Sequence, residues 1–112
     1  MLKLIGYWSA PPNPADIPAF EDVYLNRHCP KAAKIPGLKR LITTRVDEGL
    51  EGSPTSHYRV AELLFDDKSS YEEAERTPEF AAMRADGGAL VEQFGVSVVG
   101  EIGEELDHKL GG

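Results

Sequence analysis

The chain has 112 residues, the length of one domain, and its 12 Lys and Arg residues against 19 Asp and Glu residues give a net charge of −7. This acidic balance argues against binding to nucleic acid or to an anionic membrane surface. A composition of 41% hydrophobic and 28% charged residues is that of an ordinary globular protein. We expect one domain over residues 1–112, with a core at about 2–102 and a polar tail at 103–112.

Cysteine content and hydrophobic runs indicate where the protein works. Cys29 is the one cysteine and has no disulfide partner within the chain, which is typical of a reducing compartment. The apolar run at residues 2–8 is too short for a signal peptide, and no stretch approaches the roughly 18 apolar residues that span a bilayer. We therefore expect a cytoplasmic protein without a membrane partner.

The first half of the chain predicts a strand, a helix and a second strand. Residues 2–9 are rich in apolar and aromatic side chains and end at a proline-rich loop. Over residues 16–30 the apolar residues recur at helical spacing, so we expect a helix with Asp16 as its cap. A turn at 36–37 then reverses the chain, and the β-branched residues of 38–46 predict the second strand.

The second half begins with a strand and a helix. Residues 57–65 are expected to pair antiparallel with the second strand through the loop at 47–54. A helix then begins at Ser69 or Ser70, because each serine has a glutamate three residues on, which is the capping-box spacing.

This helix restarts near Thr77, an N-cap followed by proline, and we expect it to loosen at Gly87-Gly88, which leaves 89–93 as a last turn or a loop. Residues 94–102 alternate in a period of two, which predicts a fourth strand. The resulting order, β-α-β-β-α-β, predicts a ferredoxin-like α+β fold, in which a four-stranded antiparallel sheet carries two helices on one face.

Both faces of the predicted sheet are apolar. The first strand places Leu4 and Trp8 on one side and Ile5 and Tyr7 on the other. One layer of helices covers one face, and an exposed apolar face of this size is typical of an interaction surface. We therefore expect a homodimer in which a second copy covers the open face through a two-fold contact.

His28 is the leading candidate for a catalytic residue. On an ideal helix it lies about 20° from Ile17, so it shares the inward stripe with Tyr24. An imidazole there could act as general base, acid or hydrogen-bond donor to a bound ligand. The alternative is a histidine satisfied by a neighbouring carbonyl or carboxylate. Cys29 lies about 100° farther round the helix, and we interpret it as a buried structural thiol rather than a nucleophile.

Other candidate residues lie on the strands. Glu62 stands in an otherwise apolar strand, where a carboxylate must be paired, protonated or beside water. Arg40 and Arg59 are its expected partners, and a cross-strand ion pair is favoured over a catalytic carboxylate. Four aromatic residues either line a pocket or belong to the core: Trp8, Tyr24, Tyr58 and Phe65. The candidate ligand-binding residues are Trp8, Tyr24, Tyr58, Glu62 and Arg40.

Motifs for metals and nucleotide cofactors are absent from the sequence. The three histidines occur without H-x-x-x-H, H-E-x-x-H or paired cysteines, which are the usual metal-ligand spacings. The glycines form neither G-x-G-x-x-G nor a P-loop, and G-x-S-x-G does not occur. We therefore expect neither a metal nor an organic cofactor.

Three patterns of the chain recur together in one known family. They are Phe20-x-x-x-Tyr24-x-x-x-His28-x-Pro30, Ile35-Pro36-Gly37-Leu38 and Val60-Ala61-Glu62-Leu63-x-Phe65-Asp66. With the strand and proline-rich loop that precede them, they resemble the EthD family of dimeric α+β barrel proteins over residues 2 to about 102. The chain departs from many relatives at Cys29, where a small residue is more usual, and in its acidic tail.

The resemblance implies a homodimer whose two sheets close into a barrel, with His28 facing a small cleft between helices and sheet. Proteins of this kind include cofactor-free monooxygenases, lactone isomerases, polyketide-modifying enzymes and proteins that accompany a cytochrome P450 in ether degradation. The resemblance favours a cofactor-independent oxidoreductase or isomerase acting on a small apolar or aromatic metabolite, with His28 in proton transfer and Tyr24 and Tyr58 orienting the substrate. The alternatives are a non-catalytic ligand-binding or accessory protein of an oxygenase pathway, and a packed histidine without a cavity.

Overall fold

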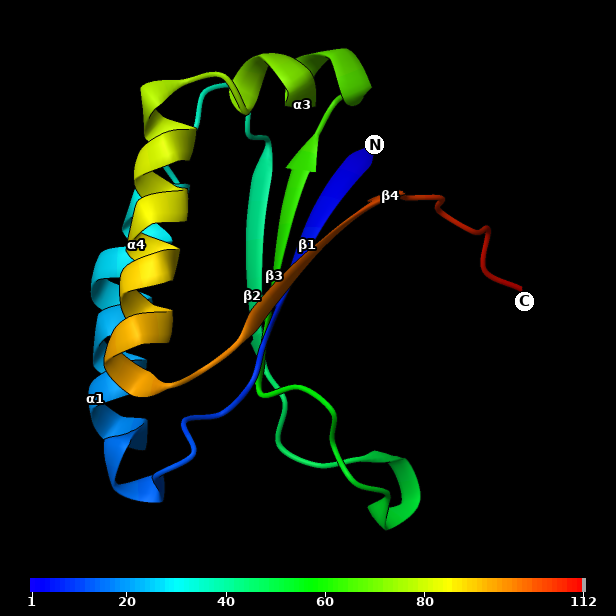
Figure 1. Cartoon of the computed structure of the whole chain (residues 1–112). Coiled ribbons are helices and arrows are strands. Elements are labelled where there is room, and N and C mark those ends of the chain that lie inside the picture. The colour runs from blue at the N-terminus through cyan, green and yellow to red at the C-terminus, as the bar shows by residue number, and fades with distance from the viewer. Residues whose placement is uncertain (112) are drawn as a thin grey trace.

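Four antiparallel strands form a single sheet in the computed structural model, which describes residues 1–111. Their order across the sheet is β2-β3-β1-β4, and their bounds are β1 (Leu2–Trp8), β2 (Arg40–Arg45), β3 (Arg59–Phe65) and β4 (Val98–Glu104). The helical segments are α1 (Ile17–Val23), α2 (Cys29–Ala32), α3 (Lys68–Ala74) and α4 (Pro78–Phe94). Figure 1 shows α1 and α4 side by side over one face of the sheet. The expected ferredoxin-like α+β fold is confirmed.

Short helical turns complete the chain. The 3₁₀ turns η1 (Pro14–Asp16) and η3 (Leu50–Gly52) lie in the two long loops. A π-helical turn, η2 (Tyr24–His28), connects α1 to α2, so the expected first helix is continuous from α1 to Ala32. None of the helices in residues 1–111 has the length and apolar character required to cross a bilayer.

The strand register places a row of small residues across the middle of the sheet. Thr43 lies opposite Ala61, Ala61 opposite Gly6, and Gly6 opposite Gly100. On the same face, two residues along each strand, lies a row of large side chains: Leu41, Leu63, Leu4 and Ile102. Trp8 and Val98 belong to the row on the opposite side of the small residues.

The small-residue row divides the core into two clusters. The first core cluster contains Leu2, Ala32, Ile35, Leu63, Phe65, Tyr71, Ala74, Phe80 and Met83. The second core cluster contains Trp8, Phe20, Tyr24, Leu90, Phe94 and Val96. Because α4 supplies large side chains to both clusters, it spans the full length of the sheet and holds the two ends of the core together.

The end of α4 corrects the prediction for residues 87–102. The helix continues through Gly87 and Gly88 to Phe94, and β4 begins at Val98. A glycine inside a helix costs about 1 kcal/mol, whereas burial of a side chain such as Leu90 or Phe94 contributes about 1.5–3 kcal/mol. Gly95 then ends the helix in a left-handed conformation with φ of 69°.

The cap of α3 also differs from the prediction. Asp67, rather than Ser69 or Ser70, is the N-cap residue, and its carboxylate accepts a hydrogen bond of 2.8 Å from the backbone N–H of Ser70. The capping-box spacing therefore predicted the first turn of the helix correctly but identified the wrong N-cap residue. An aspartate directly before the serines satisfies the same free N–H groups.

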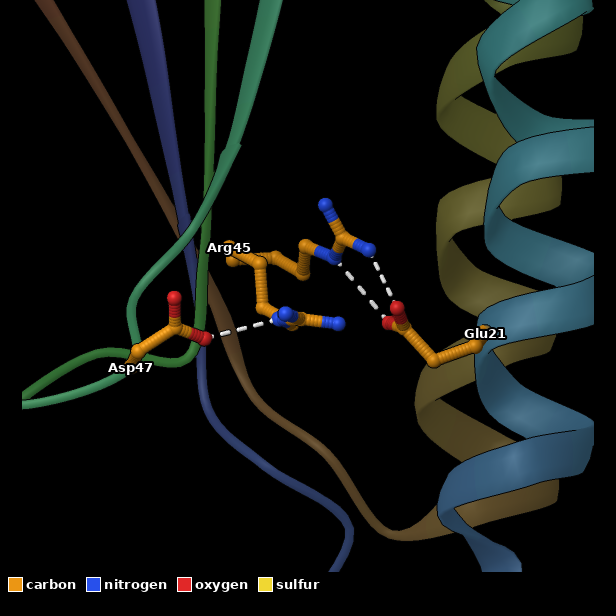
Figure 2. A network of polar contacts seen from close by, with 4 residues as sticks. Glu21, Arg45 and Asp47 are labelled. Atoms are coloured by element: carbon orange, nitrogen blue, oxygen red, sulfur yellow. Dashed lines mark hydrogen bonds and ion pairs between the residues drawn. The ribbon is translucent and has the colours of Figure 1, made fainter.

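A buried ion pair joins α1 to the sheet. Arg59 of β3 donates from Nε and a terminal nitrogen to the two carboxylate oxygens of Glu21, and Figure 2 shows Glu21 reaching from its helix toward the strands. The Arg59 side chain is 8% exposed and that of Glu21 is 19% exposed. The guanidinium also lies 5.3 Å from the centre of the Tyr24 ring. Arg59 therefore stabilises the helix and is not the partner of Glu62.

We expect Glu21→Gln to lower the free energy of unfolding by about 2–3 kcal/mol, because Arg59 then stays buried without its counter-charge. Urea denaturation measures the change. The matched control is Asp47→Asn, which removes the carboxylate 2.8 Å from Arg45, a pair exposed at 56% and 67% (Figure 2). That variant is expected to unfold like the wild type, and an equal loss in both would contradict the role of burial.

Candidate functional site

A cavity of about 320 Å³ lies where the two core clusters meet, between the helices and the sheet. Its floor is the row of small residues described above, and all four of them line it. Its walls include Trp8, Tyr24 and His28 from the second core cluster and its surroundings, and Leu63, Phe80 and Met83 from the first. The hollow exists because short side chains occupy the middle of the sheet while long ones surround them.

The π-helical turn brings two neighbouring side chains to this cavity. The N–H of Cys29 donates to the carbonyl of Tyr24, five residues earlier rather than four. Pro30 follows directly, and inside a regular helix its ring would collide with the carbonyl of Asn26. The wider turn accommodates the proline. His28 and Cys29 both line the cavity, which the ideal helix geometry did not predict for Cys29.

Asp86 of α4 holds the imidazole of His28. Nδ1 of His28 lies 2.9 Å from one carboxylate oxygen of Asp86, and Nε of Arg27 lies 2.8 Å from the other. The side chains of His28 and Asp86 are each 8% exposed. A buried carboxylate with two donors is electrostatically satisfied. The three residues therefore form a continuous chain of polar contacts from the surface to the cavity wall.

The environment of His28 favours its neutral form. Burial lowers the pKa of the imidazole below its ordinary value, and this effect exceeds the opposing influence of Asp86. With Nδ1–H donated to the carboxylate, Nε2 of the neutral ring is a free acceptor. Within residues 1–111 it has no hydrogen-bond partner, and it is not among the fully buried polar atoms. The arrangement is that of a general base whose tautomer is set by a carboxylate.

Glycine and aromatic rings pack around this imidazole. The Trp8 ring meets it edge to face with centroids 5.2 Å apart, and the Tyr24 ring stacks on it at 5.9 Å. A Cβ on Gly87 would lie 3.6 Å from Cε1 of His28 and 3.7 Å from the Trp8 ring. These are ordinary van der Waals distances, so α4 packs directly against both rings at Gly87.

Two further groups near the site are held in their neutral forms. Burial raises the pKa of the Cys29 thiol to about 11, so Cys29 is a thiol and not a thiolate nucleophile at neutral pH. Burial also raises the pKa of Tyr24 well above its usual range. The Tyr24 hydroxyl is fully buried without a hydrogen-bond partner within residues 1–111.

Three of the residues expected to bind ligand lie outside this cavity. Glu62 alternates with the lining residues Ala61 and Leu63 and therefore faces the other side of the sheet, where Lys3 lies 2.9 Å away. The expectation that Arg40 or Arg59 pairs with Glu62 was wrong. Arg40 lies on the same outer side of its strand, one residue before the lining residue Leu41. Tyr58 packs against Phe20, with ring centroids 6.2 Å apart, and does not line the cavity.

Asp86, Arg27 and Gly87 are the residues that sequence reasoning missed. Asp86 lies three residues after Met83 and four before Leu90, so it stands on the buried stripe of a helix continuous through Gly87. A carboxylate on an apolar stripe needs a partner, and that was the available signal. This signal was overlooked because the helix was expected to loosen at Gly87 and Gly88. Within residues 1–111, no group of three or more His, Cys, Asp or Glu side chains is placed to hold a metal ion.

The fold and the cavity define a ferredoxin-like α+β protein with a histidine-bearing pocket between its helices and its sheet. The chain belongs to the EthD family, because residues 14–93 match the EthD domain. It is 36% identical over 74 residues to the uncharacterized 11.0 kDa protein in the thcB-thcC intergenic region of Rhodococcus erythropolis, a match that covers 66% of this chain and 71% of that protein.

Solved structures of similar proteins match almost the whole chain. An EthD family protein from Bacillus halodurans is 32% identical, with a TM-score of 0.72 over 95% of this chain and 99% of that one. SnoaB from Streptomyces nogalater, a cofactor-independent oxygenase, has a TM-score of 0.62 at 15% identity over 96% of this chain and 94% of that one. At that identity SnoaB shares the fold alone.

Two substitutions are expected to move the pKa of His28 in opposite directions. Asp86→Asn lowers it further, because the charge that favours imidazolium is removed, and Arg27→Gln raises it, because a nearby cation is lost. NMR titration of the imidazole nitrogens measures both, with His57 as the internal control. Shifts of the same sign in both variants would contradict the opposing effects of Asp86 and Arg27 on the pKa of His28.

Proposed function

We propose that the cavity binds a small, flat, mainly apolar molecule and that Nε2 of His28 removes a proton from it. The observation that carries this proposal is the free Nε2 at a hollow site while Nδ1 is held by buried Asp86. A packed structural histidine needs no hollow beside it. Most of the lining side chains are apolar, with the exposed Glu75 and Arg84 as the charged ones, and such walls would select an aromatic or lactone-like metabolite over a highly charged one.

Proton removal opens two kinds of reaction that need no cofactor. If the proton returns to a different atom of the substrate, the reaction is an isomerisation. If the carbanion reacts with dioxygen, the reaction is an oxygenation. The description of SnoaB as a cofactor-independent oxygenase supports the second, because that protein shares this fold. We propose the same class of chemistry for this chain, with His28 as the base.

The first test is ligand binding in a variant whose cavity is filled. Small aromatics, quinones, lactones and ethers are screened by thermal shift, and a ligand at a hundred times its Kd is expected to stabilise the wild type by about 2.7 kcal/mol. Gly6→Leu projects a side chain into the cavity and is expected to abolish the stabilisation. The matched control is Gly88→Leu on the exposed side of α4, where a Cβ meets nothing within 4 Å.

The second part of this test separates catalysis from binding. His28→Gln keeps the shape of the site and is expected to retain the ligand while turnover falls by about 10²–10⁴-fold. Binding without any turnover in the wild type would instead indicate a ligand-carrying or accessory protein. Wild-type binding that Gly6→Leu leaves unchanged would show that ligands bind elsewhere.

We also propose that the protein works as a homodimer through the sheet face opposite the helices. That face carries the half-buried apolar side chains of Ile5, Tyr7, Ile42 and Val60, which no helix of residues 1–111 covers, beside the Lys3–Glu62 ion pair. Figure 1 shows the loop with η3 and the C-terminal segment projecting on this side of the sheet. Both carry strongly exposed leucines, Leu50 at 84% and Leu110 at 91%. A second copy would cover this surface.

Light scattering after gel filtration is expected to give twice the chain mass of 12.3 kDa. Val60→Lys places a charge on the open face and is expected to yield the monomer. Leu25→Lys is the control, because Leu25 is 42% exposed on the helical side of the molecule. A monomeric wild type, or dissociation by the control alone, would overturn the proposed dimer.

A further inference from the structure

The indole N–H of Trp8 is an unused hydrogen-bond donor in the cavity. Trp8 is 3% exposed, and its backbone carbonyl accepts a bond of 2.7 Å from the N–H of Tyr58. Its Nε1, in contrast, has no hydrogen-bond partner within residues 1–111 and is not among the fully buried polar atoms. Buried indole N–H groups usually find a partner. A donor left free in so buried a residue points to a group that enters the cavity.

The position of this nitrogen places the donor over the floor of the site. A Cβ built on Gly6 would lie 3.7 Å from Nε1 of Trp8 and 4.0 Å from Cβ of Ala61, so the nitrogen stands above the small-residue row. The His28 ring meets the same indole edge to face at 5.2 Å. One donor and one acceptor therefore border the same space. The Tyr24 hydroxyl, which is fully buried, does not reach that space.

We propose that Nε1–H of Trp8 binds the substrate oxygen on which negative charge develops when His28 removes the proton. This inference rests on the proposed function and narrows its substrate class. The substrate would be a flat, mainly apolar molecule that carries either a phenolic O–H or a ketone with an acidic C–H beside it. Hydrocarbons and simple ethers, which lack such a proton, would bind more weakly and would not react.

The proton and the electron pair of this step each have a defined destination in the site. The O–H or C–H bond of the substrate breaks, and its proton moves to Nε2 of His28. The electron pair stays on the substrate as a phenolate or enolate, whose oxygen accepts the hydrogen bond from Trp8. The imidazolium that forms is stabilised by the carboxylate of Asp86 at 2.9 Å. No electron acceptor is needed.

The experiment compares two ligands that differ in one group, 4-nitrophenol and 4-nitrotoluene, by calorimetric titration of the intact protein. We expect the wild type to bind 4-nitrophenol at least about tenfold more tightly, because only the phenol uses the donor and the acceptor. Trp8→Phe keeps an aromatic ring but removes the N–H. It is expected to reduce that preference roughly tenfold while the affinity for 4-nitrotoluene changes by about threefold or less.

An absorbance measurement adds a readout that a purely structural role of Trp8 would not move. The phenolate band of bound 4-nitrophenol is expected to appear at lower pH than that of the free compound, and Trp8→Phe is expected to return it toward the free value. A protein carrying 3-benzothienylalanine at position 8, in which sulfur replaces the N–H, keeps the shape of the indole and should behave like Trp8→Phe. This replacement keeps the test valid if Trp8→Phe fails to fold.

The outcomes separate the two proposals. An unchanged preference for 4-nitrophenol in Trp8→Phe, or an equal loss of both affinities, would overturn the role of the Trp8 donor. Binding of ligand by the wild type would still support the proposed function. If the wild type binds neither compound, both the proposed function and this inference fail. If Trp8→Phe loses the preference for 4-nitrophenol but still binds 4-nitrotoluene, the result supports both the proposed function and the role of the Trp8 donor.

Discussion

A hydrogen bond between two buried groups, His28 and Asp86, is the interaction on which the site depends. It links the π-helical turn to α4, so the two helical segments that cover the sheet are tied together at the cavity. Neither group is easily buried alone, because an unpaired carboxylate or imidazole loses its solvation without compensation. Arg27 satisfies the second oxygen of Asp86 from the surface. The imidazole is therefore fixed with Nδ1 occupied and Nε2 free.

The cavity beside this pair exists because the middle of the sheet carries no large side chains. Protein interiors are normally filled to the density of organic crystals, so a hollow forfeits dispersion contacts that a filled core would have. Here the row of Thr43, Ala61, Gly6 and Gly100 leaves that space while two clusters of large side chains pack at either end. The protein thus has two packed clusters on either side of a hollow centre. A largely pre-formed hollow of this kind fits the proposed binding of a small ligand.

The polar atoms in the hollow, rather than the fold, give the site its chemical character. The ferredoxin-like α+β fold is shared with proteins of low identity, and a shared fold does not select a reaction. In this chain the cavity wall includes the neutral imidazole of His28 and the indole N–H of Trp8, and the nearby thiol and phenol are kept un-ionised by burial. The other polar side chains that line the cavity are Thr43, Tyr71, Glu75 and Arg84. These groups fit the proposed removal of a single proton from a bound molecule.

Sequence patterns alone determined the element order, the antiparallel sheet and the place of His28 on the inward side of its helix. These features depend on local periodicity, turn residues and caps, which act over a few neighbouring positions. Pro30 was visible too, but the width of the turn before it depends on how the chain accommodates the ring.

Only the tertiary structure decided which residues meet. The burial of Leu90 and Phe94 carried α4 through two glycines, and that extension placed Asp86 against His28, 58 residues away in the chain. Strand register aligned four small residues that are ordinary in their own segments. The same alternation turned Glu62 and Arg40 to the outer face, because neighbouring residues of a strand point to opposite sides. Long-range packing and register have no signature within a single segment, so the site became visible only when the segments were brought together.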